Sequence, residues 1–280
     1  MLSIKNYSKH YKNFDIENLS FDIPDGTVVG LIGENGAGKS TIIKSILGVV
    51  HPDGGNILFN GREILKVGKK ERQQISFVLD DTGLPMELNL AMLDNVLSCI
   101  YDKWDSSKFR ELVRQFALPE KKLFKDFSKG MKMKAAIAVA LSYDSTILIL
   151  DEPTSGLDPV VRDEILEMIY NYNKDGNRAV LLSSHITSDL EKICDYIVYI
   201  HDGKIIFNEE KDVLLNKYAV YSIDEKKLGE LDGDAFVRII RREYGMEVLA
   251  EKDKMPHDFE YKPVTLDDIM LFYSKGEQIC

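Results

Sequence analysis

Residues 33–41 read GENGAGKST and match the pattern G-x-x-x-x-G-K-[ST] of a phosphate-binding loop. The apolar run at residues 28–32 predicts a buried strand before this loop, and residues 41–47 predict a helix after it. A chance glycine-rich turn is therefore disfavoured, because the pattern lies in the strand–loop–helix context that it requires. Glycines let backbone N–H groups turn toward a polyphosphate, and a helix N-terminus adds partial positive charge. We expect Lys39 to contact the β- and γ-phosphates and the Ser40 hydroxyl to bind Mg²⁺.

Two carboxylates follow the apolar run at residues 146–150. Asp151 and Glu152 end a predicted buried strand, and ligands bind at the carboxyl ends of parallel strands. Asp151 fits the Mg²⁺ ligand that accompanies a phosphate-binding loop, and Glu152 is placed to take a proton from an attacking water. A strand followed by an acidic helix cap is the alternative, but residues 153–154 predict a turn. His185 ends the next apolar run, where it can contact the γ-phosphate.

Two further features suit a nucleotide but have strong structural alternatives. Ser128 predicts an N-cap for a helix with small residues at 135–140, and an exposed helix start can bind an anion. Many helices begin with serine, so this signal is weak alone. Tyr11 can stack on an adenine, but the residues themselves favour a tyrosine that packs within a strand.

The composition excludes several classes of protein. The chain has 280 residues, 44% of them hydrophobic, which suits one large or two modest soluble domains. A net charge of −10 argues against a nucleic-acid partner or an anionic membrane surface. No run approaches the roughly 20 apolar residues of a membrane span, and the start lacks the apolar core of a signal peptide. Cys99, Cys194 and Cys280 are far apart and predict free thiols in a reducing cytosol.

Strands that alternate with helices predict an α/β core with a mainly parallel sheet. Short strands within residues 2–23 and a hairpin with an Asn-Gly turn at residues 60–61 predict a small antiparallel portion. Residues 75–79 predict another buried strand of the core. Helical periodicity from residue 89 to about residue 141 predicts a helical insert.

These pieces, in this order, resemble the nucleotide-binding subunit of ATP-binding-cassette (ABC) transporters. Six motifs carry the likeness: Walker A at 33–41, Walker B with its catalytic glutamate at 147–152, the signature at 128–131, the D-loop at 155–158, the switch histidine at His185 and the adenine-stacking aromatic at Tyr11. The resemblance covers residues 1 to about 215. It implies a P-loop NTPase (RecA-like) fold for residues 1–216, with an antiparallel β subdomain and a helical subdomain at about 86–141.

The motifs and the resemblance together assign the site. We expect the nucleotide ligands to be Tyr11, Gly33, Asn35, Gly36, Gly38, Lys39, Ser40, Thr41, Ser128 and Gly130. We expect the Mg²⁺ ligands to be Ser40, Asp151 and Asp80, and the catalytic residues to be Glu152, His185, Lys39 and Asp80. The family further implies a head-to-tail dimer, with each ATP between the Walker A of one subunit and the signature of the other. Ser128 and the Gly130 backbone would then bind the γ-phosphate in trans.

Two positions depart from the family pattern. The signature at residues 127–131 reads FSKGM rather than LSGGQ, a variant that resembles bacterial exporters of antibiotics and peptides more than binding-protein-dependent importers. Asp80 stands where the family usually has a glutamine that senses Mg²⁺ and the attacking water. A carboxylate at this position can bind Mg²⁺, but it adds negative charge beside the phosphates.

Residues 217–280 lie outside the resemblance and predict a small α+β appendage. We expect strands at 218–223, 248–250 and 259–261, a helix at 234–243 ended by Gly245, and a helix at 266–275 capped by Thr265. We interpret this part as a module for regulation or subunit contact. The alternative is a lid that covers the catalytic core.

The loop at residues 83–90 is unusually apolar, and exposed apolar patches often mark interfaces. Its apolar members are Leu84, Pro85, Met86, Leu88 and Leu90. They either dock a membrane partner or pack on the helical insert.

We therefore expect an ATPase that uses ATP and Mg²⁺ to drive an export-type transporter of a drug, peptide or similar substrate. Its partners would be an integral-membrane permease and a second nucleotide-binding subunit, identical or paralogous. The chain would be cytoplasmic and peripheral on the inner face of the membrane. One alternative is a soluble ABC-superfamily ATPase of DNA repair or translation, but the chain has no tandem cassette, coiled coil or zinc-binding cysteines. Another is a regulatory module that binds nucleotide without hydrolysis, against which Glu152 argues.

Overall fold

The structure is a computed structural model that describes residues 1–224, 235–242, 245–257 and 259–277. The chain divides into two units, one of residues 1–194 with 198–207 and one of residues 195–197 with 208–280. The sequence suggested a boundary at residue 217, which is about ten residues later than the division between these units.

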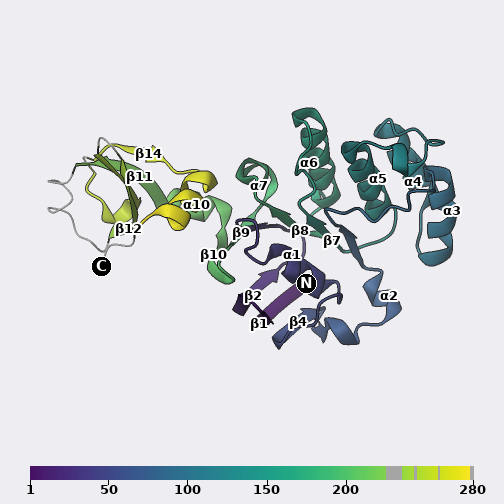
Figure 1. The fold of residues 1–280 in the computed structure, drawn as a ribbon, viewed down its shortest axis with the longest axis horizontal. Coiled ribbons are helices and arrows are strands. Elements are labelled where there is room, and N and C mark those ends of the chain that lie inside the picture. The colour runs from purple at the N-terminus through teal and green to yellow at the C-terminus, as the bar shows by residue number, and fades with distance from the viewer. Residues whose placement is uncertain (225–234, 243–244, 258, 278–280) are drawn as a thin grey trace. The chain divides into compact units, whose positions relative to one another are not determined.

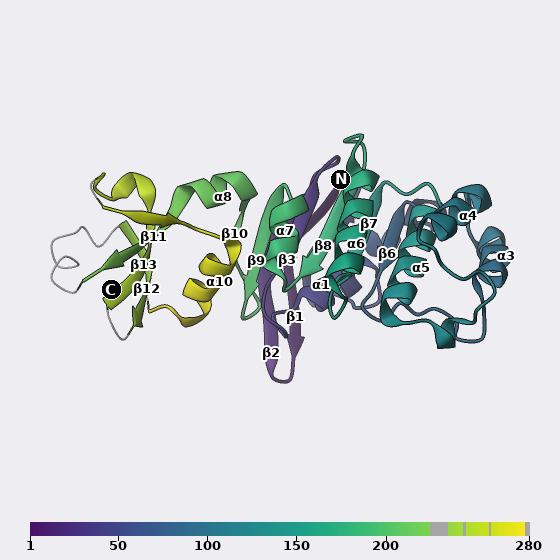
Figure 2. The same cartoon turned by 90° about the horizontal axis from the view of Figure 1, so that it is seen from above.

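A six-stranded sheet lies at the centre of the first unit, in the order β10-β9-β3-β8-β7-β6 (Figure 2). Its strands are β3 (Val28–Ile32), β6 (Ile75–Val78), β7 (Ile147–Asp151), β8 (Ala179–Ser184), β9 (Tyr196–His201) and β10 (Lys204–Glu210). The four strands β3, β8, β7 and β6 pair in parallel. Every residue of β3, β7 and β8 is buried, as expected for continuous apolar strands of a sheet covered on both faces.

Helices cover the two faces of this sheet. Figure 1 shows α6 (Pro159–Asn173) and α7 (Thr187–Ile193) on one side and α1 (Lys39–Ile46) on the other. The start of α6 is fixed by Asp158, whose side chain accepts hydrogen bonds from the backbone N–H groups of Val160 and Val161. Pro159 occupies the first turn, where its missing N–H costs nothing. The α/β class with a mainly parallel sheet is thus confirmed.

A four-stranded antiparallel sheet forms the β subdomain, in the order β2-β1-β4-β5. Its strands are β1 (Leu2–Tyr11), β2 (Phe14–Ile23), β4 (Gly54–Phe59) and β5 (Arg62–Glu63), and the short helices η1 (Ile64–Lys66) and α2 (Lys69–Arg72) follow. β1 and β2 are longer than the short strands expected from the sequence. The predicted hairpin turn is confirmed, since Asn60 and Gly61 have φ angles of 49° and 78° between β4 and β5.

The helical insert consists of α3 (Leu90–Ile100), α4 (Ser106–Gln115), η2 (Phe124–Asp126) and α5 (Lys129–Leu141). Side chains of Asn89, Asp105 and Ser128 cap its three α-helices. Leu84 and Leu90 are 8% and 1% exposed and belong to the core of this insert. For these two residues the packing alternative is therefore correct, because docking requires exposure.

The second unit contains a four-stranded antiparallel sheet in the order β12-β13-β11-β14. Its elements are α8 (Lys211–Lys217), β11 (Tyr218–Ile223), β12 (Phe236–Arg242), β13 (Gly245–Glu251), η4 (Lys252–Lys254), β14 (Tyr261–Pro263) and α10 (Leu266–Lys275). The expected strands at 218–223 and 248–250 are confirmed, as is the Thr265 cap of α10. The strand expected at 259–261 begins only at Tyr261.

The helix expected at residues 234–243 is wrong, because residues 236–242 form β12 and pair with β13. The physical reason is that this segment is rich in aromatic and β-branched residues, which suit a strand when a partner strand is present. Its end residues, Asp234 and Glu243, lie outside the described residues.

Candidate functional site

Glycine is required in the loop between β3 and α1. Gly38 has a φ of 110°, and a Cβ added there would lie 2.7 Å from the Cδ1 atom of Ile16. A Cβ on Gly33 would lie 2.4 Å from the carbonyl oxygen of Ile200. Side chains are excluded at both positions, so the loop keeps a bare backbone at the start of α1. This is the backbone that a phosphate cradle requires.

Lys39 lies across the loop that precedes it and is only 5% exposed. Its Nζ donates hydrogen bonds to the carbonyl oxygens of Gly33 (2.6 Å) and Glu34 (3.2 Å). The same Nζ lies 3.3 Å from Oε1 of Glu152. The phosphate-binding lysine and the carboxylate at the end of β7, which are far apart in the sequence, are thus direct neighbours.

Ser183 holds the two carboxylates at the end of β7. Its Oγ donates to Oδ1 of Asp151 (2.6 Å), which is 4% exposed, and accepts from the backbone N–H of Glu152 (3.0 Å). Ser183 was missed in the sequence analysis, although a signal exists in the two serines that end the apolar strand β8. Glu152 itself has a φ of 52°, a conformation that costs a non-glycine residue about 1–3 kcal/mol and is found mainly at functional sites.

His185 contacts the other oxygen of Glu152. Its Nδ1 lies 2.6 Å from Oε2 of Glu152, so Nδ1 carries the proton that is donated to the carboxylate. The Glu152 side chain is 13% exposed and lies between Lys39 and His185, with one cationic or donor group at each oxygen. Such a carboxylate has a fixed orientation, which a general base requires.

A cavity of about 460 Å³ opens beside these groups. Ten of the predicted site residues line it: Tyr11, Asn35, Gly36, Gly38, Lys39, Ser40, Thr41, Asp80, Glu152 and His185. Gly33 and Asp151 lie behind its wall, where Gly33 binds the Lys39 ammonium and Asp151 binds Ser183. Phe14 and Ser155 also line the cavity. Phe14 was missed, whereas Ser155 was named as the start of the D-loop but not assigned to the site. The signal for Phe14 is its position opposite Tyr11 in the hairpin of β1 and β2.

Tyr11 is 45% exposed and lines this cavity. Tyr7, in the same strand, is fully buried and bonded to Ser45 instead. The strand-packing interpretation therefore suits Tyr7 and does not suit Tyr11. Stacking of Tyr11 on an adenine stays a prediction, and the neighbouring Phe14 offers a second aromatic surface.

Ser128 and Gly130 line a different cavity, of about 490 Å³. The Oγ of Ser128 accepts a hydrogen bond from the N–H of Met131 (3.2 Å) and so caps α5. A Cβ on Gly130 would lie 3.3 Å from Val161 of α6, so the two helices approach closely here. Within one chain, the structure does not bring Ser128 or Gly130 into the cavity of Lys39.

The two positions that depart from the family pattern contact each other. The Nζ of Lys129 lies 3.3 Å from Oδ1 of Asp80, and both side chains are about half exposed. Exposed pairs of this kind stabilise a fold by only about 0–1 kcal/mol. The consequence is electrostatic, because Lys129 offsets the negative charge that Asp80 adds at the wall of the Lys39 cavity.

Comparisons with known proteins agree on the class of protein. Residues 16–155 match the ABC transporter family model. The lantibiotic transport ATP-binding protein SrtF of Streptococcus pyogenes is 38% identical over 217 residues, which cover 76% of this chain and 92% of SrtF. The linearmycin resistance ATP-binding protein LnrL of Bacillus subtilis (strain 168) is 33% identical over 248 residues, covering 86% of this chain and 79% of LnrL.

Solved structures give the same result. The structure of an ATP-binding subunit of an ABC transporter superposes with a TM-score of 0.68 at 32% identity, and the match covers 76% of this chain and 90% of that one. The fold and the site define a P-loop ATPase. The chain belongs to the ABC transporter family, as the sequence motifs predicted. Among the described residues, no helix has the length and apolar character needed to cross a membrane.

Proposed function

We propose that this chain binds and hydrolyses Mg–ATP to power the export of an antibiotic, peptide or similar molecule through a separate permease. The observation that carries the proposal is Glu152, held between Lys39 and His185 at the wall of the 460 Å³ cavity. The names of SrtF and LnrL, which concern lantibiotic transport and linearmycin resistance, support the export of such substrates.

The residues present fit ATP and Mg²⁺. The buried ammonium of Lys39, aimed at the loop backbone, suits the β- and γ-phosphates, and the exposed Tyr11 and the partly buried Phe14 suit the adenine. Ser40 and Asp151 would hold Mg²⁺, which supplies neutralisation of the phosphate charge when bound. Asp80, on the cavity wall, is a third candidate ligand once its contact with Lys129 is released.

In this mechanism the residues of the chain position a water and remove its proton. Glu152 accepts the proton at a carboxylate oxygen, while His185 orients the carboxylate through Nδ1 and faces the γ-phosphate. Lys39 exchanges its contacts with the loop carbonyls for contacts with phosphate oxygens. Phosphate release from ATP by the purified chain tests this function, and its complete absence would favour a module that binds nucleotide without hydrolysis.

We further propose that the chain works on the cytoplasmic face of the membrane, attached through its permease. Residues 1–216 would form the ATPase domain and residues 217–280 the appendage. A second nucleotide-binding subunit, identical or paralogous, would supply Ser128 and Gly130 to each site, because one chain holds them in a separate cavity. We expect no nucleic-acid partner, in line with the net charge of −10.

Lys39→Ala should weaken ATP binding by at least about 10-fold, because charge-assisted hydrogen bonds to the phosphates contribute about 1.5–3 kcal/mol. Isothermal titration calorimetry measures the change. Lys44→Ala is the matched control, since Lys44 is an exposed lysine of the same helix and should leave the affinity unaltered. Wild-type affinity in Lys39→Ala would contradict the assignment of the loop.

An apolar surface on the helical insert suits the permease. Met92, Val96 and Ile100 follow one another at four-residue spacing on α3 and are 48%, 44% and 48% exposed. Met86, in the loop at residues 83–90, is 41% exposed. We call these four side chains the α3 surface and propose that they dock the permease, because exposed apolar side chains that share a face, as the three on α3 do, mark interaction sites.

Val96→Asp should lower co-purification of the permease with this chain by about 10-fold or more, because it places a charge at the centre of an apolar contact. ATP binding should be retained. Val160→Asp is the matched control, since Val160 is 68% exposed on α6, away from the α3 surface. An unchanged yield of the complex with Val96→Asp would remove the α3 surface as the docking site.

Leu84 is not suitable for this test, because it is buried and a charge there would damage the core of the helical insert.

A further inference from the structure

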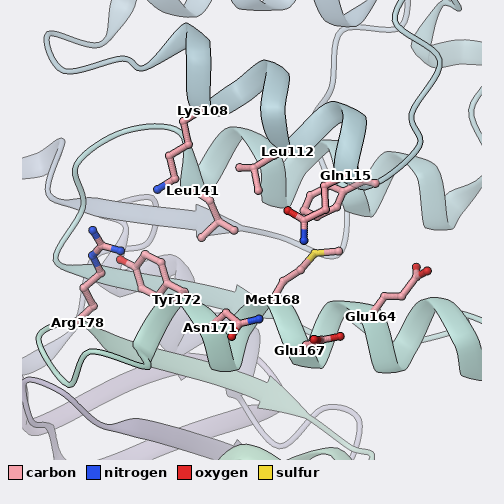
Figure 3. A pocket seen from close by; sticks show the side chains of 11 residues that line it. Lys108, Leu112, Gln115, Leu141, Glu164, Glu167, Met168, Asn171, Tyr172 and Arg178 are labelled. Carbon is pink, nitrogen blue, oxygen red and sulfur yellow. The ribbon is translucent and has the colours of Figure 1, made fainter.

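A third cavity, of about 260 Å³, lies between α4 of the helical insert and α6 (Figure 3). It is lined by neither the Walker A loop nor the signature residues. Its charges are segregated. Lys108 and Arg178 lie at one end, and Glu164 and Glu167 lie toward the other. Apolar side chains of Leu112 and Met168 lie between the two ends, so the cavity offers an amphipathic lining rather than a uniform one.

The two cations at one end are only partly balanced, because the charges of Asp105, Asp144 and Glu111 act on Lys108 but none of these carboxylates lines the cavity. No carboxylate of the described residues forms an ion pair with Lys108 or Arg178. Burial lowers the pKa of Lys108, and the nearby charge of Arg178 lowers that pKa further. The nearby Asp144 is already bound to Lys103 at 2.5 Å. A half-buried pair of like charges is costly, and an anion placed between them would relieve that cost.

Arg178 is held in place by stacking rather than by hydrogen bonds to its guanidinium. Its guanidinium carbon lies 5.1 Å from the centre of the Tyr172 ring. The Tyr172 hydroxyl is occupied by Ser145, whose carbonyl oxygen accepts from it at 3.1 Å. The planar donors of Arg178 are therefore oriented beside the cavity, and within the described residues they make no hydrogen bond. A planar fork of this kind suits a carboxylate or phosphate group.

The opposite end determines the orientation of an occupant. Glu164 forms an ion pair with Lys134, so its charge is largely balanced. Glu167 is exposed, and none of the described residues forms an ion pair with it. A second anionic group at this end would be repelled by Glu167. The cavity therefore suits a molecule with one anionic end and an uncharged or cationic remainder.

We propose that this cavity binds a small organic oxyanion, a carboxylate or phosphate monoester, with the anionic group between Lys108 and Arg178. The apolar body of the molecule contacts Leu112 and Met168. Because Lys108 and Leu112 belong to α4 and Met168 to α6, the bound molecule joins the helical insert to a helix that begins directly after the turn at residues 153–158. The test of this site does not require ATP hydrolysis.

The test uses the full chain saturated with Mg–ADP, which fills the nucleotide cavity except for the position of the γ-phosphate. Binding of a phosphate probe at that position is recognised because it is unaffected by the Lys108 and Arg178 variants described below. Three probes are titrated by calorimetry and ligand-observed NMR: phenyl phosphate, 4-phenylbutyrate and the uncharged 4-phenylbutanol. At least one anionic probe should bind saturably and at least about 10-fold more tightly than the alcohol. The reason is that hydrogen bonds to a charged group contribute about 1.5–3 kcal/mol, and about 1.4 kcal/mol corresponds to a tenfold change in affinity. The stronger of the two anionic probes identifies the phosphate or the carboxylate as the preferred group.

Variants locate the binding. Lys108→Met and Arg178→Met should each weaken the anionic probe by about 10-fold or more, while Lys108→Arg keeps the charge and most of the affinity. Lys121→Met is the matched control, an exposed lysine of the same helical insert that does not line the cavity, and it should bind like the wild type. Wild-type affinity in Lys108→Met, equal binding of the alcohol, or no saturable binding up to about 10 mM would each overturn the proposal.

Discussion

Glu152→Gln should bind ATP with near-normal affinity and lose about 10²- to 10⁴-fold of steady-state hydrolysis, the usual effect of removing a general base. The amide keeps the volume of the side chain but cannot accept the proton of the attacking water. The shape of the site is kept, but one oxygen of Glu152 contacts Lys39 and the other contacts His185, so the amide nitrogen replaces one of these two acceptors and that contact is lost. Phosphate release and calorimetry on the same protein measure the two quantities.

Asp175→Asn is the control for this experiment, because Asp175 is an exposed carboxylate in the turn after α6 and should not affect turnover. Hydrolysis by Glu152→Gln within about 10-fold of the wild type would remove Glu152 from the role of general base. A loss of ATP affinity in place of turnover would instead indicate that its ion pair with Lys39 organises the binding loop.

The parts of the site that sequence predicts well are local in the chain. The loop at 33–41 specifies a strand, a turn and a helix from adjacent residues, and the structure has all three. Asp151 and Glu152 follow the same logic, because they end an apolar strand. Ser183 and Phe14 escaped notice because each depends on a neighbouring strand: Asp151 lies opposite Ser183 in the parallel ladder, and Tyr11 lies opposite Phe14 in the first hairpin.

The sequence-based predictions that the structure contradicts fail for the same reason, because they depend on contacts with distant segments. Residues 236–242 form a strand because β13 lies beside them, and no feature of the segment alone reveals that partner. Leu84 is buried because the helical insert folds over it, whereas an apolar loop in the sequence is equally consistent with a docking surface. The contact between Asp80 and Lys129, and the facing positions of Lys108 and Arg178, also join segments that are 49 and 70 residues apart. Pairings at such separation come from the tertiary fold.

The separation of the signature from the Walker A loop leads to the second large effect. Lys39 and Glu152 line one cavity, and Ser128 and Gly130 line another. A helix N-terminus stabilises an anion only within about one turn, so Ser128 cannot act on a phosphate bound by its own chain's Lys39. Its use in catalysis requires a second subunit. ADP lacks the phosphate that would bridge the two subunits.

With Glu152→Gln present, hydrolysis no longer removes that phosphate, so ATP should convert the chain almost completely to a dimer while ADP leaves a monomer. Adding Ser128→Arg should abolish the dimer, because it removes the cap of α5 and fills the second cavity, yet it should leave ATP binding by the monomer intact. Size-exclusion chromatography with light scattering measures both states. Ser107→Arg, at an exposed serine near the start of α4, is the matched control and should dimerise normally. Normal dimerisation of the double variant Glu152→Gln/Ser128→Arg would mean that the signature lies outside the interface. If the single variant Glu152→Gln stays monomeric with ATP, the homodimer is contradicted and an obligate paralogous subunit is indicated.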